Sequence, residues 1–213
     1  AATGGNFTIS GNRRVEFRGN AEGSTESGWL LRSIYAKNDN SSTVVALCAT
    51  EATDSITFYD TVYVGRTFVT ELNKGGSGRI TFSGKYAAED LAALGGGNLT
   101  ASQTSIFESA VAIQGGVLEI AEGAILQTPT LTTASGAATE LNSGSISGAL
   151  VINSGAALYA SGSNTVSSAL SMSTGSSLNL TLGAENLSAA ALSVNSLSGL
   201  GNVNFSINSG DII

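Results

Sequence analysis

The stretch that decides the fold is Gly148–Leu158, which reads GALVINSGAAL. Two short apolar segments, ALVI and AAL, flank a polar turn centred on Gly155. Strand side chains point alternately to opposite faces, so an apolar segment this short predicts a strand that buries one face. Glycine at the turn can adopt a positive φ without steric cost. The stretch therefore predicts two short strands joined by a glycine corner.

The same pattern recurs along the second half of the chain. Copies occupy residues 116–126 and 169–178, and residues 131–139 form a degraded copy with Gly136 at the corner. Successive copies are marked by lead leucines 13, 19 and 20 positions apart, namely Leu118, Leu131, Leu150 and Leu170. A spacing near 20 suits one coil of a parallel β-helix, in which each strand stacks on its counterpart one turn away. We interpret the 13-residue step as a shortened turn.

An antiparallel sandwich or barrel is the alternative for short strands with Gly/Ser turns. Such folds usually carry hairpin signals such as Asn-Gly or Asp-Gly, and this chain has neither dipeptide. Its corners read Glu-Gly-Ala, Ser-Gly-Ala and Thr-Gly-Ser. We predict an all-β, right-handed parallel β-helix, one continuous solenoid of roughly ten coils spanning on the order of 50 Å at about 4.8 Å per layer.

One segment departs from the strand pattern. Residues 86–94 read YAAEDLAAL, are rich in helix formers, and are followed by Gly95–Gly97, a strong helix stop. We predict three parts: residues 1–85 as an irregular first part of the β-helix, residues 86–97 as a short helix with a Gly-rich loop, and residues 98–213 as regular β-helix repeats.

The composition limits the classes of partner. Charged residues make up 12% of the chain and apolar residues 42%, so a sizeable core is available and disorder is not expected. All nine Lys and Arg residues lie between Arg13 and Lys85, whereas residues 86–213 hold eight carboxylates and no basic residue. An acidic half of this kind repels nucleic acid and anionic lipid. We therefore predict no nucleic-acid partner.

The chain lacks the residue sets of common catalytic centres. It has no His, and its single cysteine, Cys48, lies in the apolar run 44–49, where we predict a buried small hydrophobe. Asp54 and Asp60 flank a strand-like segment, but a regular strand separates them by roughly 20 Å, beyond the about 5–9.5 Å that paired catalytic carboxylates need. Arg66 and Arg79 follow nearby. We predict no enzyme, and no catalytic, cofactor-binding or metal-binding residues.

Exposed aromatic side chains near arginines could hold a glycan or a protein partner. The first part of the chain contains such a group, namely Trp29, Tyr35, Tyr59 and Tyr63 with Arg13, Arg14, Arg18 and Arg32. The alternative is that these aromatics fill wider first coils. Ser, Thr and Asn along the strands could likewise bind a ligand or only support the stack as ladders. No ligand-binding residue is assigned on this basis.

An ordered series of motifs resembles the polymorphic outer-membrane-protein (Pmp-like) autotransporter passengers. The series runs from about Phe17 to Leu126 and comprises FRGN at 17–20, SITFYD at 55–60, ELNK at 71–74, GRITFSGK at 78–85, GGVLEI at 115–120 and EGA at 122–124. A further Phe-x-x-Asn occurs at 205–208, while the family's Gly-Gly-Ala-apolar repeat is present only in reduced form, at 122–125 and 147–150. The resemblance implies a β-helical passenger at the bacterial cell surface or outer membrane, or secreted. It also implies a C-terminal outer-membrane barrel, which this chain lacks.

We expect a mature or excised fragment that is not itself inserted in a membrane, since no stretch approaches the about 18 apolar residues of a membrane span. The expected function is that of an adhesin or a structural stalk that binds a host-surface protein or a glycan. The alternative is a carbohydrate-active enzyme, a polysaccharide lyase or glycoside hydrolase, on the same scaffold. Two carboxylates within catalytic range would favour that enzyme.

Overall fold

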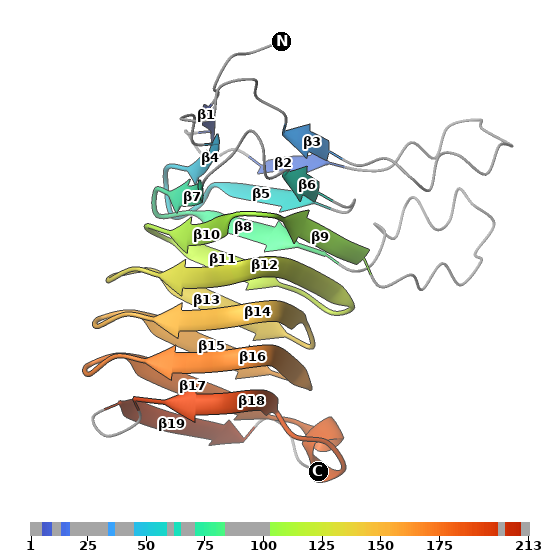
Figure 1. The fold of residues 1–213 in the computed structure, drawn as a ribbon, viewed down its shortest axis with the longest axis vertical. Coiled ribbons are helices and arrows are strands. Elements are labelled where there is room, and N and C mark those ends of the chain that lie inside the picture. The colour runs from blue at the N-terminus through green and yellow to red at the C-terminus, as the bar shows by residue number, and fades with distance from the viewer. Residues whose placement is uncertain are drawn as a thin grey trace, which may run out of the picture.

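A computed structural model describes residues 6–9, 14–17, 34–36, 45–58, 62–64, 71–83, 103–199 and 203–209. Within these residues the chain is all-β, and its strands lie in successive layers (Figure 1). Every strand pair among them is parallel, so the antiparallel sandwich or barrel is excluded for this part. The helix predicted at 86–94 lies outside the described residues.

The strands form two parallel sheets. An 11-stranded sheet contains, in spatial order, β1 (Asn6–Ile9), β4 (Val45–Ala49), β7 (Glu71–Gly75), β10 (Ala110–Ile113), β12 (Ala124–Thr133), β14 (Ser145–Ile152), β16 (Asn164–Met172) and β18 (Leu192–Ser198), with a branch of β3 (Ile34–Ala36), β6 (Val62–Val64) and β9 (Gln103–Phe107) that joins β12. An 8-stranded sheet contains β2 (Arg14–Phe17), β5 (Ser55–Phe58), β8 (Arg79–Phe82), β11 (Val117–Ile120), β13 (Ala138–Asn142), β15 (Ala157–Ser161), β17 (Ser177–Leu182) and β19 (Asn204–Ser209).

From β10 to β19 the chain alternates between the two sheets, and each strand pairs with its counterpart one layer away. Leu131 is in register with Leu150, and Leu150 with Leu170, so the predicted spacing of about 20 residues is confirmed for these layers. Leu170 pairs with Leu197, a longer step that includes the short 3₁₀ helix η2 (Ala184–Leu187).

Two expectations about the repeat were wrong. Leu118 lies in the 8-stranded sheet opposite Thr139, so the 13-residue step compares two different sheets and is not a shortened turn. The described residues place eight strands in the 8-stranded sheet, fewer than the roughly ten coils expected. Longer segments connect several of these strands, as between Ile80 and its register partner Leu118, so fewer layers fit in the chain.

Strand β12 bends where it passes from one neighbour to another. Its first half pairs with β9 and its second half with β10. Between Gln127 and Thr130 the register against β14 shifts, so that Thr128 and Pro129 lie opposite the single residue Gly148. Proline lacks the N–H that a sheet ladder uses, and it is tolerated at a bulge of this kind.

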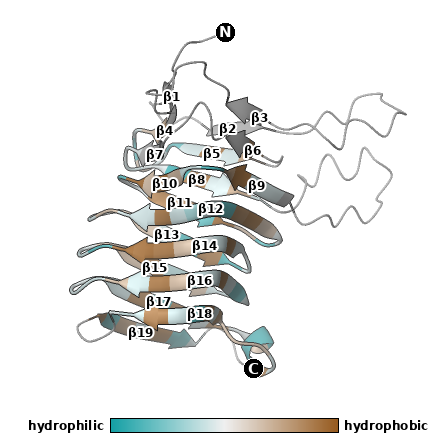
Figure 2. Cartoon of the chain, in the orientation of Figure 1, coloured by the Kyte–Doolittle hydropathy of each residue, from teal (hydrophilic) through white to brown (hydrophobic). Residues whose placement is uncertain are grey.

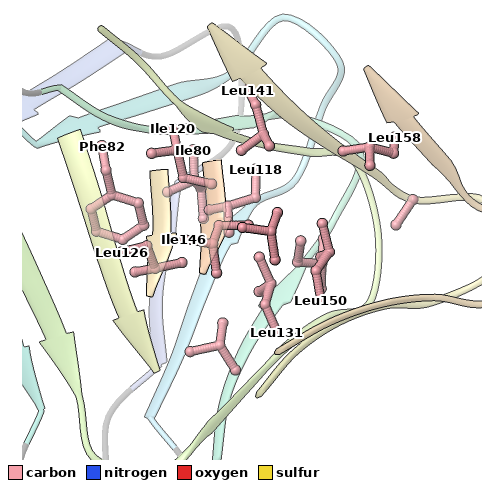
Figure 3. Close-up of a cluster of buried hydrophobic side chains, with 14 of the residues drawn as sticks. Ile80, Phe82, Leu118, Ile120, Leu126, Leu131, Leu141, Ile146, Leu150 and Leu158 are labelled. Atoms are coloured by element: carbon pink, nitrogen blue, oxygen red, sulfur yellow. The ribbon is translucent and has the colours of Figure 1, made fainter. Parts of the chain in front are cut away.

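Inward-facing side chains form apolar ladders along the stack, and Figure 2 shows apolar positions recurring from layer to layer. Leu131 and Leu150 are fully buried, as are Ile80 and Ile120 (Figure 3). Towards the N-terminal layers the core is aromatic, and the rings of Phe58 and Phe82 stack with centroids 5.4 Å apart. Burial of these side chains is the main stabilising contribution to the stack.

The glycine corners have the predicted geometry. Gly136, Gly155 and Gly175 have φ values of 78°, 72° and 78°. They also stack on one another, because the Gly136 N–H donates to the Gly155 carbonyl at 3.0 Å and the Gly155 N–H donates to the Gly175 carbonyl at 3.1 Å. The corners therefore carry the inter-layer hydrogen bonding from one sheet towards the other.

The degraded copy at 131–139 contains a compensated pair of polar side chains. Thr133 is in register with Ile152, and Thr139 with Leu158, so two threonines occupy apolar ladder positions. Both threonines are fully buried, and their hydroxyl oxygens lie 2.7 Å apart in a hydrogen bond. Each hydroxyl thus satisfies the other inside the core.

Replacing one of these threonines by valine is expected to cost more than replacing both. T133V or T139V leaves a buried hydroxyl without its partner, at a cost of about 1–3 kcal/mol in the free energy of unfolding. The double variant T133V/T139V removes both polar groups and is expected to be as stable as the parent chain or more so. Denaturant unfolding of the four proteins measures this coupling, and a double variant whose loss equals the sum of the single losses would contradict it.

Candidate functional site

Two glutamates stack directly on the outer face of the 8-stranded sheet. Glu119 on β11 is in register with Glu140 on β13. Strand alternation points both outward, because their neighbours Leu118, Ile120 and Leu141 point into the core. Like charges directly opposite each other in a sheet are destabilising unless they are compensated.

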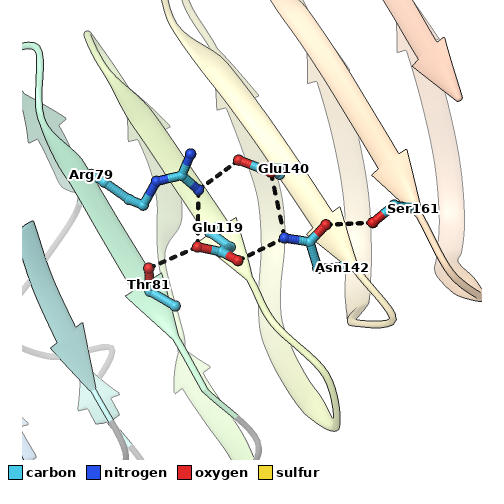
Figure 4. Close-up of polar contacts among 6 residues, drawn as sticks. All are labelled: Arg79, Thr81, Glu119, Glu140, Asn142 and Ser161. Atoms are coloured by element: carbon cyan, nitrogen blue, oxygen red, sulfur yellow. Dashed lines mark hydrogen bonds and ion pairs between the residues drawn. The ribbon is translucent and has the colours of Figure 1, made fainter. Parts of the chain in front are cut away.

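Arg79 on β8 supplies this compensation. Its Nη1 lies 2.9 Å from Oε2 of Glu119 and 2.6 Å from Oε2 of Glu140 (Figure 4). The Asn142 amide donates to Oε1 of Glu119 at 2.7 Å and to Oε1 of Glu140 at 3.4 Å. We call Arg79, Glu119, Glu140 and Asn142 the Arg79 cluster.

Two hydroxyl groups extend the Arg79 cluster to the neighbouring strands. The Thr81 hydroxyl on β8 donates to Oε2 of Glu119 at 3.0 Å, and the Ser161 hydroxyl on β15 donates to Oδ1 of Asn142 at 2.6 Å. The connected polar groups therefore span β8, β11, β13 and β15 (Figure 4). This network links four successive layers on one face of the stack.

The charge state of Arg79 is secured by its partners. Burial lowers the pKa of the guanidinium, but hydrogen bonds and charge attraction from Glu140 and Glu119 outweigh burial and hold the pKa above its usual value. A cation with a raised pKa contributes stability that is present below its unfolded pKa and is lost only as the pH rises through the folded pKa. Arg79 therefore remains a cation across the physiological range and is not a pH switch.

The Arg79 cluster brings two carboxylates close together, which sequence reasoning missed. The Oε2 atoms of Glu119 and Glu140 bind one nitrogen at 2.9 and 2.6 Å, so they lie within about 5.5 Å of each other. Carboxyl groups about 5–5.5 Å apart are typical of retaining glycosidases. Here, however, the arginine and the asparagine occupy these oxygens, an arrangement that stabilises the sheet face.

An exposed aromatic side chain continues the same face. Tyr159 on β15 follows Glu140 in register, and Asn179 on β17 follows Tyr159. Tyr159 is 46% exposed, while its neighbours Leu158 and Ala160 are buried. A tyrosine ring offers an apolar face together with a polar hydroxyl, a combination enriched at binding interfaces. We call Glu140, Tyr159 and Asn179 the Tyr159 face.

A hollow of about 360 Å³ lies elsewhere, at the bend of β12. It is lined by Ile106, Phe107, Glu108, Gln127, Thr128, Pro129 and Ser147. Phe107 is only 2% exposed, and the Thr128 hydroxyl already donates to the Ser109 carbonyl at 3.0 Å. The hollow therefore offers a ligand less accessible aromatic surface than the Tyr159 face does.

The other residues singled out from the sequence have mixed outcomes. Asp54 is buried at the turn before β5, where its Oδ2 accepts the Glu51 N–H at 2.9 Å, so it serves that turn rather than a cleft. Tyr35 and Tyr63 pair in register between β3 and β6, and Arg14 lies on β2. The remaining ones lie outside the described residues, namely Arg13, Arg18, Trp29, Arg32, Tyr59, Asp60 and Arg66.

Cys48 is only half-buried, so the prediction of a buried small hydrophobe was wrong. Strand alternation explains this, because Ala49 of the same strand points into the core and is fully buried, whereas Cys48 points the other way. Its Sγ lies 3.9 Å from the Thr50 hydroxyl.

Removing the Arg79 cation is expected to destabilise the 8-stranded sheet. R79M leaves Glu119 and Glu140 stacked without a counter-charge, and we expect a loss of about 1 kcal/mol at neutral pH, since the pairs are partly exposed to solvent. E140Q combined with R79M removes the like-charge contact and is expected to recover most of this loss. Denaturant unfolding at low and high salt measures both effects; equal stability of R79M and the parent at low salt would contradict the account.

No helix among the described residues is long and apolar enough to cross a membrane. The same residues contain no group of three or more His, Cys, Asp or Glu side chains placed to hold a metal ion. No protein-family model matches the chain, and neither a curated protein nor a solved structure shows significant similarity to it.

Proposed function

We propose that the chain is part of a right-handed parallel β-helix that acts as an adhesin or structural stalk, and that the Tyr159 face contacts the ligand. The ladder of buried residues from Leu131 through Leu150 to Leu170 supports the stalk, because a continuous core stiffens an elongated stack. The exposed Tyr159 between Glu140 and Asn179 is the observation that carries the binding role.

The chemistry of the Tyr159 face suits a neutral, hydroxyl-rich ligand. The aromatic ring can stack on the apolar side of a sugar ring, while the Asn179 amide can both donate and accept hydrogen bonds. Glu140 can accept hydrogen bonds from hydroxyl groups. A glycan therefore fits this face better than a polyanion, which the acidic half of the chain would repel.

The biological setting of the proposal follows from the motif resemblance. A Pmp-like autotransporter passenger is displayed at the bacterial outer membrane or secreted, where a host-surface protein or glycan is the natural partner. A stack of layers separates a binding face from the point of attachment, which is the task of a stalk.

Binding to a glycan array and to mucin tests the proposal, with release of sugar followed in the same samples. We expect saturable binding without sugar release, and a loss of at least about tenfold in affinity for Y159A. L187A is the matched control, because Leu187 is 76% exposed on η2, outside the 8-stranded sheet. Absence of binding, or binding that Y159A and L187A weaken equally, would contradict the role of the Tyr159 face.

A carbohydrate-active enzyme is the second candidate, favoured by the short separation of the Glu119 and Glu140 carboxylates. In that case the same samples would release sugar, and E140Q would abolish the release. Catalysis would also require Arg79 to give up at least one carboxylate when substrate binds. We favour binding without turnover because both carboxylates already have these partners.

A further inference from the structure

The apolar core is open at the C-terminal end of the stack. Phe205 on β19 is in register with Leu178, and Leu197 on β18 with Leu170. Leu178 and Leu170 are 6% and 1% exposed, but Phe205 and Leu197 are 58% and 45% exposed. Ile207 on β19 is 56% exposed as well. Core positions of the last described layer therefore face solvent.

The same end presents two open strand edges. Strands β18 and β19 terminate the 11-stranded and 8-stranded sheets within the described residues (Figure 1). Natural edge strands are usually protected from pairing by charged side chains, proline or bulges. The sequences of β18 and β19, LSVNSLS and NFSINS, contain no charge and no proline.

The charge distribution selects what can cover this end. The chain carries a net charge of −7, so two copies repel each other over most of their surface. Residues 186–210 contain no charged residue, which makes the C-terminal end the place where two copies can meet without like-charge contact. By contrast, β2 at the other end of the 8-stranded sheet contains Arg14 and Glu16.

We propose that two copies of this chain associate end to end through β18 and β19. A two-fold axis across the stack would bring the open edges of one copy against those of the other, as antiparallel strands, and would make the contact isologous and closed. Phe205, Ile207 and Leu197 would then be buried as their counterparts are in the inner layers. The inference does not depend on the proposed function.

Sedimentation velocity of the 213-residue chain over a range of concentrations tests the proposal. We expect a monomer–dimer equilibrium that saturates at the dimer. Its dissociation constant is expected to change by less than about threefold between about 50 mM and about 500 mM NaCl, because the interface carries no charge. The double variant F205K/I207K is expected to weaken the dimer at least about tenfold, since it buries unpaired charges.

Two further variants separate the interface from general effects of charge. L197K changes the other strand edge and is expected to weaken the dimer as well, whereas Y159K adds a lysine to the side of the stack and is expected to leave it intact. Thermal unfolding checks that each variant is folded. A monomer at every concentration, open-ended assemblies, or a dimer that survives both F205K/I207K and L197K would overturn the proposal.

Discussion

Replacing Leu150 by alanine is expected to lower the free energy of unfolding by about 2–5 kcal/mol. Leu150 is fully buried in the middle of the stack, in register with Leu131 on one side and Leu170 on the other. The side chains above and below belong to strands fixed by their own ladders, so they cannot close the cavity fully. Denaturant unfolding monitored by circular dichroism measures the loss.

L197A is the matched control for this prediction. Leu197 occupies the same ladder in the last described layer, but it is 45% exposed. Its truncation at a protein concentration where the chain is monomeric is expected to cost less than about 1 kcal/mol. Equal losses for L150A and L197A would contradict a core that runs through the inner layers and opens at the end.

Replacing Gly148 by alanine is expected to destabilise the chain by about 3 kcal/mol. Gly148 has a φ of 152°, and a Cβ placed on it would collide with the backbone carbonyl oxygen of Thr128. That carbonyl belongs to the bulge of β12 opposite Gly148, so relieving the collision requires β12 or β14 to shift. Thermal unfolding is the measurement, with the expected result a clear fall in the midpoint.

G136A separates backbone conformation from collision. Gly136 has a φ of 78°, but a Cβ there would meet no atom within 4 Å. Its replacement is therefore expected to cost only the left-handed backbone conformation, about 1–2 kcal/mol. A loss for G136A as large as for G148A would show that the collision with Thr128 is not the dominant effect.

The sequence predicts the stacking of Leu131, Leu150 and Leu170 because identical positions one layer apart need the same side chain. It fails at Leu118 because the corners of the two sheets look alike. Gly123 and Gly155 both have positive φ and are both followed by alanine, so a copy that begins at Leu118 matches a copy that begins one sheet later.

Half of the Arg79 cluster carried a sequence signal. Glu119 and Glu140 are one layer apart in the sequence and share the outward parity of their strands, so a 20-residue repeat could have paired them. Arg79 could not be added in this way, because 40 residues separate it from Glu119 and the segment between them includes a long insertion. The paired threonines had a signal too, since the degraded copy lacks two apolar residues at once.

The central claim is that the layers are parallel and in register, about 20 residues apart. Disulfide formation between engineered cysteines tests it directly in a C48S background. Ala138 and Ala157 are register partners on neighbouring strands, and the about 4.8 Å between such strands lies within the range that a disulfide spans. In an antiparallel hairpin between β13 and β14, Ala138 would instead lie opposite Ala149.

The account predicts that A138C/A157C forms an intramolecular disulfide in mild oxidant and that A138C/A149C does not, because Ala149 lies in the other sheet. Non-reducing peptide mapping after proteolysis identifies the bond. Cross-linking of A138C/A149C with none in A138C/A157C would contradict the parallel stack and, with it, the stalk built on it.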